Sequence, residues 1–189
     1  MRTLPGHEGR LVHGLCAVPF GGRELVASGG DDGTVRLWDP ATGRPHLVLD
    51  AGTEPDDGTH PRRGLCAFEL DGRDVLATGG DDGTVRLWDA ATGELLHKLD
   101  CASQSFGVCA VQVAGRALVA TVGGGNDDLR LWDAESGELL HTLQGHTGPV
   151  WCGVCALPRP EGPLLASGGG SPQASSTAAT ASISTSWSS

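Results

Sequence analysis

The chain has 189 residues, a formal net charge of -10, 30 glycines and only 13 lysines and arginines. This length suits one domain of ordinary size, and the dispersed acidic charge excludes the clustered basic surface that binds nucleic acid or acidic membranes. No apolar run approaches the ~20 residues of a membrane span, and the opening residues, MRTLPGHEGR, lack the regions of a signal peptide. We therefore expect a cytoplasmic protein that binds neither nucleic acid nor membrane.

The first residues match the end of a repeat whose beginning is absent, because RTL before Gly6-His7 matches HTL before Gly145-His146. The first full unit then runs from about residue 6 to 50. It holds four short apolar runs separated by glycine, proline and aspartate, at 11–18, 24–28, 34–38 and 46–49. Runs of this length, rich in valine, leucine and tryptophan, predict β-strands and are too short for ordinary helices.

The same order of runs recurs along the chain. The second unit has them at 64–70, 74–78, 84–88 and 94–99, and the third at 106–113, 117–122, 128–132 and 138–143. A fourth unit supplies only 150–157 and 163–167. GGDDGTVRLWD stands unchanged at 29–39 and 79–89, and a looser copy, GGGNDDLRLWD, stands at 123–133. Self-similarity at a fixed period indicates a repeat architecture.

Residues 169–189 break this pattern, where the template requires Asp-Asp-Gly-Thr and a third strand ending in Trp-Asp. The segment is rich in serine, alanine and threonine and has no charge, so we expect it to be disordered. Trp187 follows Ser167 by 20 residues, against 10 between the equivalent residues of the first unit, which argues against a third strand from this tail. We hypothesise that a shift of reading frame or a similar accident in the gene replaced the end of the fourth unit.

Four short strands per unit, a Gly-His near the start and a Trp-Asp ending the third strand resemble the WD-repeat β-propeller family. The resemblance implies an all-β fold of blades, each a four-stranded antiparallel sheet. It divides the chain into a propeller segment, 1–168, and the tail, with three complete blades and a partial fourth at about 6–50, 51–100, 101–144 and 145–168. Because such rings usually need four to eight blades, we expect an incomplete, open propeller.

The resemblance also implies a structural hydrogen-bonded set in each blade, formed by the Gly-His histidine, a Ser or Thr of the second strand, an Asp of the next turn and the Trp. A buried indole N–H and a buried hydroxyl need such partners. The sets are His7, Ser28, Asp32 and Trp38 in the first blade, Thr78, Asp82 and Trp88 in the second, and Thr121 and Trp132 in the third.

The later sets are incomplete. The histidine position of the second blade falls on Asp57, with His60 three residues later, and that of the third blade falls on Asp100. Asn126 and Asp127 compete for the acid role in the third blade. The fourth blade keeps His146 and Ser167 but has neither the Asp nor the Trp.

Other chemical readings explain these residues less well. A hydrolase triad needs one constellation of Ser, His and Asp, not a copy in every repeat. The Gly-Gly-Asp-Asp-Gly turn lacks the spacing of calcium loops, and Cys152 and Cys155 would point to opposite faces of a strand. One cysteine per repeat, in GLCA or GVCA, fits a small buried core residue; these are Cys16, Cys66, Cys109 and Cys155. We expect no catalytic residue, no cofactor and no metal.

The resemblance implies a non-catalytic scaffold for protein–protein interaction, with specificity in its loops. The distinctive loop is the acidic AGTEPDDGTH at 51–60, and Glu54, Asp56 and Asp57 are the candidate partner contacts. One alternative is a truncated or frame-shifted remnant of a larger WD-repeat protein without independent activity; a propeller-hosted enzyme is a weaker one. An open propeller exposes unpaired strand edges, so self-association is also expected.

Overall fold

The computed structural model describes residues 3–51, 62–102, 104–123, 128–144, 146, 153–160, 162–169 and 177–182. Within these residues, fifteen strands form four antiparallel sheets, and the only helical element is a 3-10 turn, η1, at His7–Gly9. The described part of the chain therefore has no helix long and apolar enough to cross a membrane.

The first three sheets each contain four strands in chain order, which confirms the expected all-β architecture. Blade 1 consists of β1 (Val12–Phe20), β2 (Arg23–Gly30), β3 (Thr34–Trp38) and β4 (Pro45–Asp50). Blade 2 consists of β5 (Arg62–Leu70), β6 (Arg73–Gly80), β7 (Thr84–Asp89) and β8 (Leu95–Asp100). Blade 3 consists of β9 (Ser105–Val113), β10 (Arg116–Gly123), β11 (Leu129–Asp133) and β12 (Leu139–Leu143).

The fourth sheet, blade 4, has three strands: β13 (Val154–Leu157), β14 (Leu164–Gly169) and β15 (Thr177–Ser182). The prediction of a disordered tail is wrong for residues 177–182, which pair with β14 as a third strand. In blade 1, Trp38 pairs with Val26; in blade 4, Ala181 stands at the tryptophan position and pairs with Leu165. A third strand can form without the tryptophan, so the long spacing from Ser167 to Trp187 does not exclude one.

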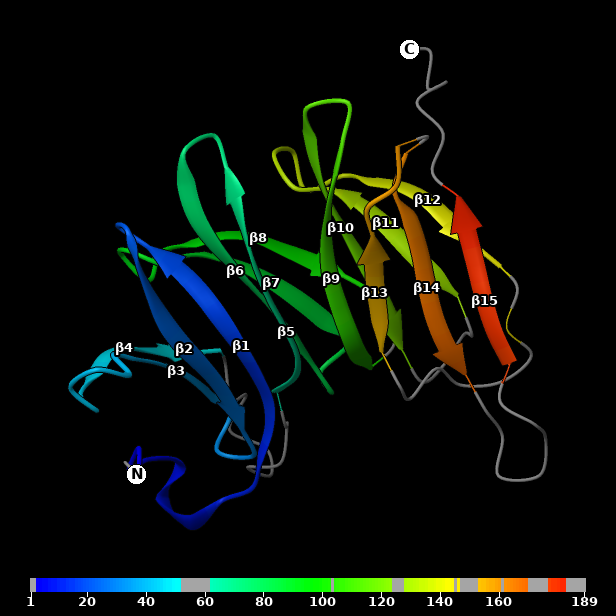
Figure 1. Ribbon diagram of the computed structural model, residues 1–189. Coiled ribbons are helices and arrows are strands. Elements are labelled where there is room, and N and C mark those ends of the chain that lie inside the picture. The colour runs from blue at the N-terminus through cyan, green and yellow to red at the C-terminus, as the bar shows by residue number, and fades with distance from the viewer. Residues whose placement is uncertain are drawn as a thin grey trace.

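The four blades stand side by side in chain order (Figure 1). Contacts between neighbouring blades join their first strands, β1 to β5, β5 to β9 and β9 to β13. Blades 1 and 4 lie at opposite ends of this row, so the propeller is open (Figure 1).

The core lies between the blades, because each strand points alternate side chains to its two faces. We call the face that carries the tryptophan the Trp face. Trp88 of blade 2 shares a buried cluster with Leu25 and Leu37 of blade 1, and Trp132 of blade 3 shares another with Leu87 of blade 2. A third cluster joins blades 3 and 4. The Trp face of each blade thus covers the opposite face of the blade before it.

The turn between the third and fourth strands repeats because its sequence repeats. The Asp39 carboxylate accepts hydrogen bonds from the backbone N–H groups of Ala41 at 2.8 Å and Thr42 at 3.0 Å. Gly43 closes the turn with a φ of 74°, a conformation that favours glycine. Asp89 and Asp133 make the same bonds in blades 2 and 3.

Candidate functional site

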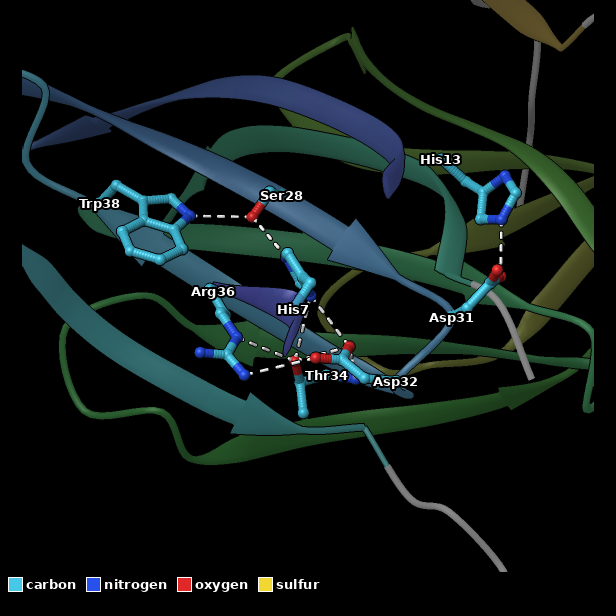
Figure 2. A network of polar contacts seen from close by, with 8 residues as sticks. All are labelled: His7, His13, Ser28, Asp31, Asp32, Thr34, Arg36 and Trp38. Atoms are coloured by element: carbon cyan, nitrogen blue, oxygen red, sulfur yellow. Dashed lines mark hydrogen bonds and ion pairs between the residues drawn. The ribbon is translucent and has the colours of Figure 1, made fainter. Parts of the chain in front are cut away.

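Four polar side chains of blade 1 form a continuous hydrogen-bonded chain (Figure 2). The indole N–H of Trp38 donates to the Ser28 hydroxyl oxygen at 2.8 Å. The same oxygen lies 2.8 Å from His7 Nε2, and His7 Nδ1 lies 2.9 Å from the Asp32 carboxylate. Because Ser28 accepts from the indole, we assign its own proton to the bond with His7 Nε2. In this assignment the Nδ1–H of His7 donates to Asp32.

Two glycines allow His7 and Trp38 to lie close to the backbone. A Cβ atom on Gly30 would lie 2.5 Å from His7 Nδ1, and a Cβ on Gly6 would lie 2.6 Å from the Trp38 ring. The Gly-His pair therefore has a physical reason, since the glycine makes room for the indole while the histidine reaches the strand hydroxyl. His7 itself adopts a left-handed backbone with a φ of 55° and is buried.

Asp32 has further partners that sequence analysis did not place. It accepts hydrogen bonds from the Thr34 hydroxyl at 2.9 Å and the Thr34 N–H at 3.1 Å, and Arg36 pairs with it at 3.3 Å. Burial raises the pKa of Asp32, but the bonds from His7 and Thr34 outweigh it and hold the pKa below its ordinary value of 3.8. The signal for the backbone bond was present, because an Asp side chain in a turn often accepts from the backbone N–H two residues on.

Blade 2 repeats the indole and carboxylate parts of this network. Trp88 donates to the Thr78 hydroxyl at 3.0 Å, and Asp82 accepts from the Thr84 hydroxyl at 2.9 Å. Arg86 pairs with Asp82 at 2.7 Å. The candidate histidine and the candidate partner contacts of the preceding loop lie outside the described residues: Glu54, Asp56, Asp57 and His60.

Blade 3 replaces the histidine with a cysteine. Trp132 donates to the Thr121 hydroxyl oxygen at 3.0 Å, and the Cys101 thiol lies 3.7 Å from the same oxygen. Sequence analysis placed Asp100 at the histidine position, but the side chain that reaches Thr121 comes one residue later. The available signal was a cysteine in an otherwise polar stretch, DCASQS, because free cysteines are usually buried. Asn126 and Asp127 lie outside the described residues.

Blade 4 keeps one bond of the network. His146 Nε2 lies 2.7 Å from the Ser167 hydroxyl. Its buried Nδ1 has no hydrogen-bond partner among the residues described. The position that corresponds to Asp32, residue 171, lies outside them.

In chemical terms, Ser28, His7 and Asp32 have the order of a hydrolase triad. A nucleophile must reach its substrate, but Ser28 is only 5% exposed and its oxygen already accepts the Trp38 indole N–H. Buried polar groups of this kind need partners within the fold, and here they find them. No three His, Cys, Asp or Glu side chains within the described ranges could hold a metal ion.

Comparison with known families decides the identity of the repeats. The family model described as WD domain, G-beta repeat, matches residues 1–39, 63–89 and 137–171, which together exceed half of the chain. The chain belongs to the WD-repeat family. A comparison with curated proteins gives no match.

Two solved structures resemble this WD-repeat protein in fold. The crystal structure of the computationally designed Ika4 protein has a TM-score of 0.65 and 23% identity, covering 93% of this chain and 94% of that chain. The crystal structure of the computationally designed Ika8 protein has a TM-score of 0.59 and 24% identity, covering 82% of this chain and 42% of that chain. The WD-repeat chain therefore spans less than half the length of Ika8.

Proposed function

We propose that this WD-repeat chain is a non-catalytic scaffold that binds another protein through the loops and turns at the ends of its strands. WD domains generally mediate protein–protein interaction. The proposal rests on one observation. The side chains that could act in catalysis are hydrogen-bonded to one another and to Trp38 inside the blade: Ser28, His7 and Asp32. The groups left for recognition are those of the turns and loops.

A basic partner surface suits this chain best. A hollow of about 300 Å³ opens at the strand ends between blades 2 and 3, and it is lined by Leu70, Asp71, Arg73, Leu96, His97 and Glu135. A neighbouring hollow of about 70 Å³ adds Glu69 and the ion pair of Arg116 with Asp133. Acidic groups outnumber basic ones there, and the predicted contacts of the 51–60 loop are acidic too. Complementary charge steers such partners together and suppresses wrong ones.

Charge reversal tests the proposal. Three forms are used to capture proteins from the source cells: the native chain, a Glu54→Lys/Asp56→Lys/Asp57→Lys variant and an Asp71→Lys/Glu135→Lys variant. Glu24→Lys, an exposed acidic site on blade 1, is the matched control. We expect one partner to be lost from one of the two variants and retained by the control.

Two results would contradict the scaffold. Capture of no partner by the native chain would favour a chain without independent activity. Turnover in a broad hydrolase screen that Asp32→Ala abolishes, while circular dichroism shows a folded protein, would favour an enzyme.

A further inference from the structure

At each end of the row, one blade face lacks the neighbouring blade that covers the same face inside the row. Inside the chain, the Trp face of one blade covers the opposite face of the blade before it, and this happens three times. Blade 1 has its Trp face at one end of the row, and blade 4 has its opposite face at the other. We propose that two copies of the chain associate head to tail through these faces and close one ring of eight blades.

Exposed side chains on β1 show that part of the Trp face of blade 1 is uncovered. Leu15, Leu65 and Val108 hold the same position in blades 1, 2 and 3, since each pairs with the Ser or Thr that receives the indole N–H. Leu65 packs into the cluster between blades 1 and 2, and Val108 is 6% exposed between blades 2 and 3. Leu15, on blade 1 at the end of the row, is 69% exposed. Val48, on the same face of blade 1, is 49% exposed.

Exposed side chains on β13 show that part of the opposite face of blade 4 is uncovered. Val18 of blade 1 and Leu157 of blade 4 are equivalent, because each lies two residues after the repeat cysteine. Val18, covered by blade 2, is 0% exposed, whereas Leu157 is 46% exposed. The cysteines agree: Cys109 is buried beneath blade 4, and Cys155 is exposed. The expectation that all repeat cysteines are buried is thus wrong for Cys155, and Cys16 and Cys66 are only partly buried.

The outer edge of blade 4 favours a second copy over another partner. Its order, β13-β14-β15, gives it three strands within the described residues, where the other blades have four. Residues 1–4 precede Gly6-His7 as residues 140–143 of the outer strand β12 precede Gly145-His146. In the head-to-tail pair, this alignment places Thr3 and Leu4 of one copy beside β15 of the other. An extended segment added to an open sheet edge is an established mode of association.

The number of blades fits a closed ring. A head-to-tail contact gives a closed ring when the rotation between copies completes a circle, and an open filament when it does not. Two rows of four blades give eight, within the usual range for propellers.

Sedimentation analysis of the full chain tests the proposal. At about 0.15 M salt, which screens repulsion between two acidic chains, we expect the mass of two 19.3 kDa chains. Leu15→Asp and Leu157→Asp should each give the mass of one chain. Leu139→Asp is the control, since Leu139 is 46% exposed on blade 3, which has a blade on both sides. Circular dichroism and tryptophan fluorescence establish that each variant is folded.

Mixing the two variants separates head-to-tail from face-to-face association. A pair made of one Leu15→Asp chain and one Leu157→Asp chain holds one contact with both substitutions and one unchanged contact. The mixture should regain two-chain mass at higher concentration, although neither variant does so alone. The proposal is overturned by a native chain of one-chain mass, by a series of larger masses, by a Leu157→Asp variant that still pairs, or by a mixture that never pairs.

Discussion

In blade 3 the Cys101 thiol lies 3.7 Å from the Thr121 hydroxyl oxygen, in the place where blade 1 has His7 against Ser28. The other bond to that hydroxyl does not change, because Trp132 donates to it at 3.0 Å as Trp38 donates to Ser28 at 2.8 Å. A thiol is a weak donor compared with an imidazole. The indole–hydroxyl bond is therefore the constant element of these blades, and the third partner differs between them.

Removal of the strand hydroxyl should cost more in blade 1 than in blade 3. Ser28→Ala leaves both the Trp38 N–H and His7 Nε2 without their partner, whereas Thr121→Val leaves the Trp132 N–H and a weak thiol. A buried polar group left unpaired costs about 1–3 kcal/mol. We expect Thr121→Val to lower the free energy of unfolding by about that amount, and Ser28→Ala by more. Urea unfolding at one fixed protein concentration measures both. Equal losses would show that the His7 bond contributes nothing.

The set of four residues in blade 1 was implied by the resemblance to WD repeats, and the changes in later blades were not. GGDDGTVRLWD fixes a turn, a strand and the indole in one continuous stretch, so its residues meet wherever the chain folds as a hairpin. The partner of Thr121 comes from a separate segment, and the distance from Gly-His in sequence gave Asp100 instead of Cys101. A shift of one residue changes which side chain reaches Thr121, because neighbouring residues of an extended chain point in opposite directions.

The third strand of blade 4 was missed for a different reason. Its residues, TAATAS, carry little apolar surface, and composition alone predicts disorder for such a segment. The backbone of β14 nevertheless offers unpaired N–H and C=O groups, and these need partners whatever side chains the incoming strand carries. Strand pairing of this kind depends on a neighbour placed by the rest of the fold, which a local composition does not contain.

The two adjacent aspartates of blade 1 should differ in their contribution to stability. Asp32 accepts bonds from His7 and Thr34 and pairs with Arg36, while Asp31 pairs with His13 at 2.6 Å near the surface. Loss of a buried, charge-assisted set costs about 1.5–3 kcal/mol, and an exposed ion pair contributes about 0–1 kcal/mol. Asp32→Ala should therefore lower the urea midpoint far more than Asp31→Ala. Equal effects would contradict the placement of Asp32 in the network.

A methyl group on Gly30 should destabilise blade 1 through His7. The added Cβ would lie 2.5 Å from His7 Nδ1, and overpacking of this kind typically costs about 1–3 kcal/mol. His7→Ala removes the clash. The double variant His7→Ala/Gly30→Ala should therefore lose less free energy of unfolding than the two single variants lose together. Thermal unfolding of all four proteins gives the coupling energy. Strictly additive losses would mean that the methyl group meets something other than His7.

Acid should unfold the protein through the turn aspartates. For Asp133, burial raises the pKa, but bonds from the Ser136 and Glu135 backbone and from Arg116 outweigh it, so the pKa lies below 3.8 in the folded state. Backbone hydrogen bonds also lower the pKa of Asp39 and Asp89, which hold the equivalent turn position in blades 1 and 2. A carboxyl with a lowered pKa when folded stabilises the protein above its unfolded pKa, and this contribution is lost as the pH falls through the folded value. The free energy of unfolding should thus be steady at neutral pH and decline below 3.8.

The matched variant Asp133→Asn isolates one of these turns. It keeps the side-chain carbonyl that accepts the Glu135 and Ser136 N–H groups but has no proton to gain, so the decline below 3.8 should be shallower than in the native chain. Urea unfolding at a series of pH values gives both slopes. A native chain whose stability rises on acidification would contradict the lowered pKa values.

Cysteine labelling should report whether a second copy covers blade 4. Burial raises the pKa of the Cys109 thiol to about 12, so Cys109 should stay unlabelled in any folded form because the thiolate is the reactive species. Cys155 is exposed in a single chain and should label rapidly in the Leu15→Asp variant. In the native chain, paired as proposed, Cys155 should be protected, and dilution should restore its reactivity. A Cys152→Ser background removes the neighbouring thiol from the count. Equally fast labelling of Cys155 in the native chain at all concentrations would show that this face stays uncovered.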